Sequence, residues 1–174
     1  MTLHHPELSQ LLYNSTILLD TNVFSIAAKS NDFAEFLIEL KNNASCSYAT
    51  IPSVVFEVTN GSSTLEVYNQ RAEYINFLVD TVLPMKFLDK IMDFAVLMAK
   101  INANNKSFTD FQLAACLYQY KHTSIYLMTT DLRALPVFFD RKFIVTTEEN
   151  SNDVRNFGIY NFNEENYIKA LKKV

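Results

Sequence analysis

The sequence predicts an α/β domain with a mostly parallel central sheet that helices cover on both faces. Short apolar runs alternate along the chain with longer segments in which apolar residues recur at spacings of three and four. The short runs are typical of buried strands and the longer segments of amphipathic helices. Strands that alternate with helices favour a parallel sheet. No repeat, low-complexity stretch or linker interrupts the pattern, so residues 1–174 are expected to form a single domain.

Turn and capping residues mark the elements of the first half of the chain. Pro6 and Pro52 each suit the first turn of a helix, and Gly61 suits a helix end. Pro84 places the third strand at a sheet edge or at a strand end. Helices are predicted over 6–14, 22–30, 30–43, 52–61 and 64–80. Strands are predicted over 16–20, 46–51 and 82–85.

The second half of the chain continues the alternation. Ser107 to Asp110 resembles a capping box, and Asn163 is a good cap for the final helix. Residues 148–156 are polar and predict a loop, whereas 132–140 give no clear pattern. Helices are predicted over 87–102, 107–122 and 163–173. Strands are predicted over 124–130 and 143–147, and 157–162 is either a last strand or an extended cover.

Composition narrows the function classes. The net charge of −4 gives no overall positive field, which argues against a nucleic-acid coat protein or repressor but leaves room for an enzyme whose acids hold cations. Only two glycines are present, which excludes Gly-rich nucleotide loops. Cys46 and Cys116 are expected to be buried free thiols. A soluble, cytoplasmic protein is expected, because the sequence has neither a signal-peptide pattern nor an apolar run near the ~18 residues of a membrane span.

Four acids fall at comparable places in the predicted fold. Asp20 follows the apolar run Ile17-Leu18-Leu19 and so ends the first strand, and Asp131 ends the fourth strand. Glu57 lies on the helix after the second strand, and Asp110 lies in the first turn of the helix before the fourth. A doubly wound sheet makes the first and fourth strands neighbours, with a crevice at their carboxyl ends. All four acids are therefore expected to face one crevice.

Four carboxylates in one crevice repel one another, which raises their pKa values and lowers stability unless cations neutralise them. Oxygen ligands without His or Cys suit Mg²⁺ or Mn²⁺. One or two such ions generate a hydroxide and stabilise the attacking and leaving oxygens of a phosphodiester. The pattern therefore predicts hydrolysis of a nucleic-acid strand.

Each acid also has a simpler interpretation. Asp20, Asp110 and Asp131 are all placed where they can cap a following helix, and Glu57 can be a solvated helix residue. The three histidines show no ligand spacing with the acids and are expected at the surface.

At these residues the chain resembles the PIN-domain nucleases, a family that includes the toxin ribonucleases of bacterial toxin–antitoxin pairs. The first matching stretch, ILLDTNVF around Asp20, is the most specific. In the family the fourth strand often ends in Thr-Asn-Asp with another Asp two residues on, whereas Asp131 is followed here by Leu132 and Arg133, so that second acid is absent. The other matching stretches are IPSVVFEVTNG, SFTDFQLAA and YLMTTDLRALP.

The resemblance implies a PIN-like three-layer α/β/α sandwich and an endoribonuclease of single-stranded RNA that depends on Mg²⁺ or Mn²⁺. It also implies an antitoxin partner in some members and often a homodimer. By the same resemblance Asp20, Glu57, Asp110 and Asp131 bind metal directly or through water. Thr130, or else Asn22, orients a ligand or a water, although Asn22 also suits helix capping.

Substrate contacts are weakly marked. Lys106 and Arg133 are expected to contact RNA phosphates, as Lys29, Arg141 and Lys142 can, although most surface basic residues are simply solvated. Neither Lys106 nor Arg133 belongs to a motif.

Two other function classes stay open. The missing second acid near Asp131 and the acidic net charge favour a catalytically weak PIN-like module that binds protein or RNA. A phosphotransfer enzyme with Asp20 as nucleophile is a third hypothesis. Aspartyl-phosphate phosphatases need a second Asp two residues after the first, and Asn22 stands there.

Overall fold

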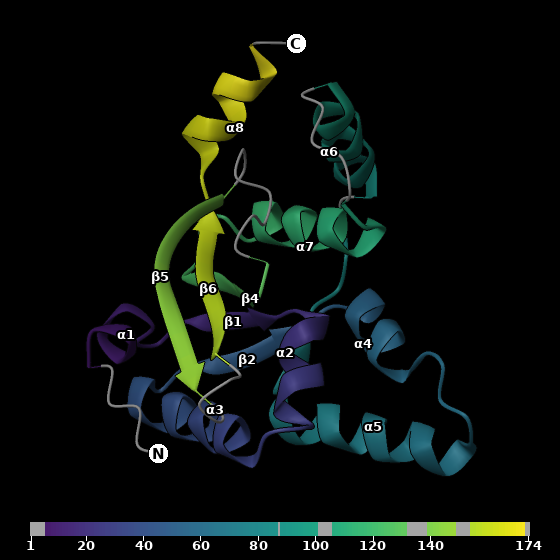
Figure 1. The fold of residues 1–174 in the computed structure, drawn as a ribbon. Helices are drawn as coiled ribbons and strands as arrows, with labels where there is room; N and C mark the ends of the chain where they lie inside the picture. Colours follow the sequence, from purple (N-terminus) through teal and green to yellow (C-terminus); the bar gives the residue numbers. More distant parts are fainter. Residues whose placement is uncertain (1–5, 87, 101–105, 132–138, 149–153, 173–174) are drawn as a thin grey trace.

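The computed structural model describes residues 6–86, 88–100, 106–131, 139–148 and 154–172. The fold is α/β, with a six-stranded mixed sheet in the order β3-β2-β1-β4-β6-β5 (Figure 1). The strands are β1 Thr16–Leu19, β2 Ser47–Thr50, β3 Thr81–Val82, β4 Ile125–Thr129, β5 Phe139–Glu148 and β6 Val154–Phe162. The helices are α1 Pro6–Leu11, α2 Thr21–Ala27, α3 Asn31–Ala44, α4 Pro52–Thr59, α5 Leu65–Leu78, α6 Leu88–Lys100, α7 Phe108–Gln119 and α8 Glu164–Leu171.

The first four strands form the parallel part of the sheet. β1 pairs in parallel with β2 on one side and with β4 on the other, and β2 pairs in parallel with β3. The sequence prediction that the first and fourth strands are neighbours is therefore confirmed. In this register Leu19 pairs with Met128, so the residues that follow β1 and β4 leave the sheet side by side.

The last two strands run against the parallel part. β6 lies between β4 and β5 and is antiparallel to both. The interpretation of 148–156 as a loop is wrong for 154–156, which begin β6. These residues are polar because they lie in an exposed strand pair, where the Thr146 hydroxyl donates to the Asn156 side-chain oxygen at 2.7 Å. The prediction for residues 132–138 falls outside the described residues.

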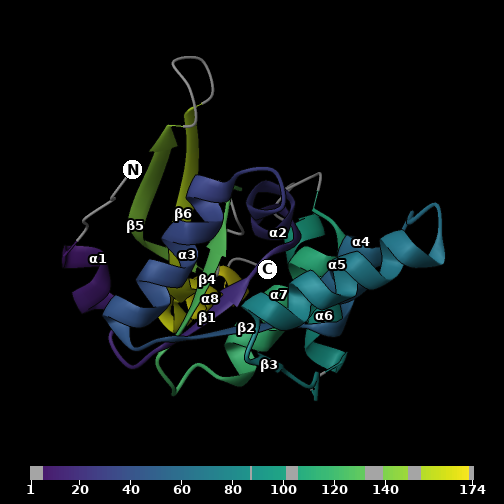
Figure 2. The same ribbon diagram turned by 90° about the horizontal axis from the view of Figure 1, so that it is seen from below.

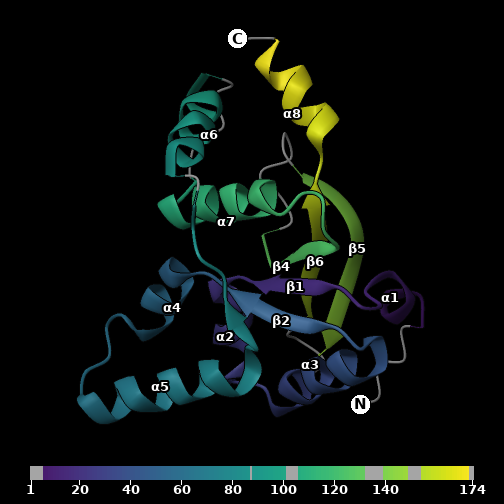
Figure 3. The same cartoon turned by 180° about the vertical axis from the view of Figure 1, so that it is seen from behind.

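Helices lie on both faces of the parallel strands. Figures 1 and 3 show α6 and α7 on one face, and α2, α3 and α5 on the other. Figures 1 and 2 place α4 and the start of α5 at the opposite end of the molecule from the β5–β6 pair. Within the described segments, no helix combines the length and the apolar character that a bilayer crossing requires.

The core follows the predicted periodicities. Ile17, Leu18 and Leu19 of β1 are fully buried, as expected for a central strand covered on both faces. Cys46 and Cys116 are buried free thiols, as predicted. A core of this kind holds the ends of β1 and β4 on a rigid base, because close-packed interiors resist rearrangement.

Gly158 of β6 lies under an aromatic ring. A methyl group on Gly158 would come within 2.5 Å of Tyr160 Cζ and 2.6 Å of its hydroxyl oxygen. Tyr160 is only 3% exposed and cannot swing freely into solvent. We therefore expect Gly158→Ala to lower the free energy of unfolding by about 1–3 kcal/mol, the usual cost of overpacking. Urea unfolding monitored by circular dichroism measures this change.

A double-mutant cycle isolates the cause of that loss. If the Tyr160 ring is the obstacle, Gly158→Ala should cost almost nothing in a Tyr160→Leu background, because the ring is gone. An equal cost in both backgrounds would show that the backbone of β6, rather than the ring, requires glycine.

Candidate metal site at the ends of β1 and β4

Asp20 is the central residue of a hydrogen-bonded network at the carboxyl ends of β1 and β4. Its side chain is 8% exposed. One carboxylate oxygen, Oδ1, accepts from the Thr21 amide at 2.7 Å. The other, Oδ2, accepts from the Asn22 amide group at 2.5 Å and from the Thr129 hydroxyl at 2.6 Å. Asp20 is also the N-cap of α2, so its capping role and its place in the network coexist.

The charge of Asp20 is poorly compensated. Burial raises the pKa of Asp20, the bonds from Thr129, Thr21 and Asn22 lower it, and the negative charge of Asp110 raises it again, with a net rise. No basic group of the described residues contributes to this balance. A buried carboxylate near a second acid and without a cationic partner costs stability in its ionised form.

Thr129 and Asn22 connect the two strand ends. The Thr129 hydroxyl donates to Asp20 and accepts from the Asn22 side-chain amide and from the Asp131 backbone N–H, both at 3.1 Å. The Asn22 side-chain oxygen accepts from the Thr130 backbone N–H at 2.9 Å. The hydroxyl contact that the sequence prediction gave to Thr130 is thus made by Thr129, and Thr130 contributes its amide.

Glu57 lies between the starts of two helices. Its Oε2 accepts from the Thr21 hydroxyl at 2.5 Å, and its Oε1 accepts from the Thr109 hydroxyl. Thr21 begins α2 and Thr109 lies in the first turn of α7, whereas Glu57 itself is on α4. Glu57 is exposed, but both of its oxygens are held in place by donors from other elements.

Asp110 caps α7 as predicted. Its Oδ2 accepts from the Ser107 backbone N–H at 2.7 Å and from the Ser107 hydroxyl at 3.0 Å, which completes the capping box. These bonds leave Oδ1 of Asp110 without a hydrogen-bond donor in the described part of the chain. The effect of Asp110 on the pKa of Asp20 shows that the two carboxylates are electrostatically coupled.

Asp131 forms an ion pair with Lys106. The Lys106 ammonium donates to Asp131 Oδ2, and the Lys106 side chain is only 12% exposed. The Asp131 backbone is held by Thr129, as described above. Arg133, the other basic residue expected to contact phosphate, lies outside the described residues.

Hydrogen bonds and charges thus place the four predicted acids in one neighbourhood, but not in one tight cluster. Asp131 is linked to Asp20 through Thr129, and Glu57 is linked to Asp20 through Thr21. Across the described ranges, no group of three or more His, Cys, Asp or Glu side chains is close enough to hold a metal ion together. The strongest pairing is between Asp20 and Asp110.

Three threonines in this network were not singled out from the sequence. Thr21 follows Asp20 directly, Thr109 precedes Asp110 directly, and Thr129 lies beside Asp20 because β1 and β4 are in register. The signal that could have found Thr129 is the parallel pairing of the two strands. For Thr21 and Thr109 the signal is a hydroxyl next to a predicted ligand.

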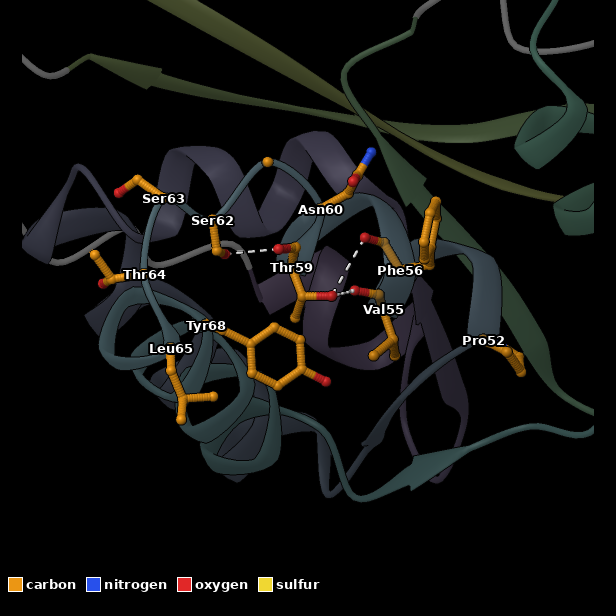
Figure 4. A pocket seen from close by; sticks show the side chains of 11 residues that line it. Pro52, Val55, Phe56, Thr59, Asn60, Ser62, Ser63, Thr64, Leu65 and Tyr68 are labelled. Carbon is orange, nitrogen blue, oxygen red and sulfur yellow. Dashed lines mark hydrogen bonds between the residues drawn. The ribbon is translucent and has the colours of Figure 1, made fainter.

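A separate surface hollow lies at the connection from α4 to α5. Its volume is about 750 Å³, and its lining runs from Pro52 to Tyr68 (Figure 4). Phe56, Leu65 and Tyr68 of this lining are exposed by 65%, 74% and 46%. None of the four predicted acids lines this hollow, so it is distinct from the network around Asp20.

Known proteins add no family assignment to this geometry. A scan against protein-family models and a search of curated proteins both find no match to the chain, so the Asp20 network itself carries the functional argument.

Proposed function

We propose that this chain is a Mg²⁺- or Mn²⁺-dependent endoribonuclease that hydrolyses phosphodiester bonds of single-stranded RNA, on a PIN-like three-layer α/β/α fold. The observation that carries the proposal is Asp20, a carboxylate that is 8% exposed, coupled to Asp110 and placed at the carboxyl end of a central parallel strand. Strand ends of this kind are where open α/β sheets bind their ligands. The resemblance around ILLDTNVF supports the same chemistry.

The residues present fit a hard divalent cation. The carboxylates and hydroxyls around Asp20 offer oxygen atoms, which Mg²⁺ and Mn²⁺ prefer. Burial and the charge of Asp110 raise the pKa of Asp20, and a nearby cation would offset both effects. The oxygen Oδ1 of Asp110, which lacks a donor among the described residues, is available as a ligand atom.

The protein's own groups would position the reaction. A bound divalent ion supplies Lewis-acid stabilisation of the phosphodiester and activation of a water. Asp20 and Asp110 are the proposed ligands. Glu57, fixed by Thr21 and Thr109 and open to solvent, would orient the attacking water or accept its proton. Thr129 holds the Asp20 carboxylate in one orientation.

An assay with defined substrates tests the proposal. The full chain is incubated with a labelled single-stranded RNA, the DNA of the same sequence and a double-stranded RNA, each with Mg²⁺, with Mn²⁺ or with excess EDTA. Cleavage of the single-stranded RNA that requires the divalent ion is expected. Absence of cleavage with every RNA tried, or equal cleavage in EDTA, would contradict the proposal.

A second candidate function is a catalytically weak PIN-like module that binds protein or RNA. The specific observation in its favour is that the described acids form no group of three that could share a metal ion. Calorimetric titration with Mn²⁺ separates the two proposals. Heat of binding that vanishes in Asp110→Ala would reject the module.

The same resemblance leads us to propose a homodimer and, if the chain is a toxin, an antitoxin partner. The exposed apolar side chains of Phe56, Leu65 and Tyr68 form the kind of surface that protein partners cover. Light scattering checks the dimer directly. A mass near the 20.0 kDa of one chain at micromolar concentration would contradict it.

A further inference from the structure

Lys106 holds an unusual place for a lysine next to a proposed metal site. Its side chain is 12% exposed, and its ammonium group pairs with Asp131, whose side chain is 37% exposed. Lysines are almost never this deeply buried unless they are paired, and exposed pairs are easily separated by solvent. The ion pair is therefore a fixed part of the folded structure.

The position of Lys106 in the chain brings its charge to the Asp20 network. Lys106 precedes Ser107, the N-cap of the helix that carries Asp110. Its partner Asp131 donates its backbone N–H to the Thr129 hydroxyl, which in turn donates to Asp20. Two hydrogen bonds thus connect the residue that Lys106 neutralises with the most buried acid of the site.

We propose that Lys106 is a built-in counter-ion that keeps Asp131 neutralised, so that the site binds one divalent ion, at Asp20 and Asp110, and not two. This inference rests on the proposed metal-dependent function. It assigns Lys106 to the metal site itself, whereas the sequence suggested a contact with RNA phosphate.

Electrostatics explains why the ammonium excludes a second ion. A second divalent ion at Asp131 would have to displace Lys106, which would leave a mostly buried ammonium group without its carboxylate. If Lys106 stayed in place, its positive charge would repel the incoming ion at short range, where the protein screens charges less than water does. Both routes disfavour a second ion.

The distribution of the other acids is consistent with a single ion. Asp20 and Asp110 are coupled to one another, whereas Glu57 is occupied by two threonine hydroxyls. In the segments that the structure describes, no third acid is close enough to complete a shared cluster. The pair Asp20 and Asp110 is therefore the place for the one ion.

Isothermal titration calorimetry with Mn²⁺ on the full chain tests the inference. The wild-type protein should bind one ion. Lys106→Met removes the charge and keeps a chain of similar length, and it should bind Mn²⁺ roughly tenfold more tightly or take up a second ion. Lys106→Arg keeps the charge and should behave like the wild type. Two ions in the wild type, or identical binding by Lys106→Met, would overturn the inference.

Asp131→Asn gives a second test that does not depend on the stability of the Lys106→Met variant. If Asp131 belongs to Lys106, Asp131→Asn should still bind one Mn²⁺ ion, with an affinity within about threefold of the wild type. A loss of tenfold or more would identify Asp131 as a direct ligand and reject the inference.

Failure of this inference is distinguishable from failure of the proposed function. One ion in the wild type that is lost in Asp20→Asn, with Lys106→Met unchanged, would refute only the role of Lys106. No Mn²⁺ binding by the wild type would refute the metal-dependent function, and the role of Lys106 with it.

Discussion

Asp20→Asn is expected to lower the rate of Mn²⁺-dependent RNA cleavage by at least about 100-fold. The substitution keeps the size of the side chain but removes its charge and one acceptor oxygen. Asp20 accepts three hydrogen bonds and is the most buried of the four acids, so no neighbouring carboxylate can take its place. The measurement is a time course of cleavage with labelled single-stranded RNA at saturating Mn²⁺.

Asp80→Asn is the matched control for this prediction. Asp80 also exchanges a carboxylate for an amide, but it pairs with Lys41 at 2.6 Å and accepts from the Tyr48 amide at 2.8 Å, away from the proposed ligands. Cleavage by Asp80→Asn should stay close to that of the wild type, provided that circular dichroism shows it folded at the assay temperature. Equal activity of Asp20→Asn and the wild type would remove Asp20 from the mechanism.

The second large effect concerns the stability of the metal-free protein as a function of pH. Burial, reinforced by Asp110, raises the pKa of Asp20 above its ordinary value of 3.8. Between that value and the raised pKa the folded protein binds more protons than the unfolded chain, so its stability falls as pH rises. Each unit by which a folded-state pKa exceeds the unfolded-state pKa corresponds to about 1.4 kcal/mol.

Comparison of the wild type with Asp20→Asn isolates this contribution. Urea unfolding in EDTA from pH 4 to pH 8 should show the wild type losing stability relative to the variant as pH rises, and then a constant difference. Groups such as Asp80, whose pKa is lowered by Lys41 and the Tyr48 amide against the effect of burial, contribute to both proteins and cancel. Asn offers one acceptor oxygen to three donors, and that cost is independent of pH.

Saturating Mn²⁺ should abolish the decline, because a bound cation stabilises the ionised form of Asp20. A decline that is the same with and without Mn²⁺ would show that the ion does not bind at Asp20. A flat difference in EDTA would show that the carboxylate is not destabilised by its surroundings.

The parallel half of the fold could be predicted from the sequence because local patterns determine it. The run Ile17-Leu18-Leu19 is apolar without alternation, which is typical of a strand covered on both faces, and Asp20 ends it where the apolar run stops. Ser107 and Asp110 identify the start of α7 through capping chemistry that operates within one turn. Short-range signals of this kind survive in any tertiary context.

The antiparallel half could not be predicted in the same way. The strand at 143–147 was found, but its direction depends on pairing with β6, which no local pattern encodes. The start of β6 was interpreted as a loop because Asn156 is polar, and only the pairing with Thr146 accounts for it. Strand pairing is a long-range contact, and the sequence signal for it is weak.

The contacts within the site divide along the same line. The positions of Asp20 and Asp131 at adjacent strand ends follow from topology alone. The ion pair of Lys106 with Asp131 and the bonds from Thr109 and Thr21 to Glu57 join residues 25, 52 and 36 positions apart. Side-chain pairs at such separations depend on the packing of the finished fold, and the general rule that surface lysines are solvated pointed away from Lys106.

The place of β6 in the sheet has a consequence for how the polypeptide reaches its native state. β6 is the last strand along the chain, yet it lies in the interior of the sheet next to β4. During synthesis from the N-terminus, the outer flank of β4 therefore stays unpaired until nearly the whole chain has left the ribosome. Exposed flanks of this kind recruit other chains, so the nascent protein passes through a period in which association competes with maturation.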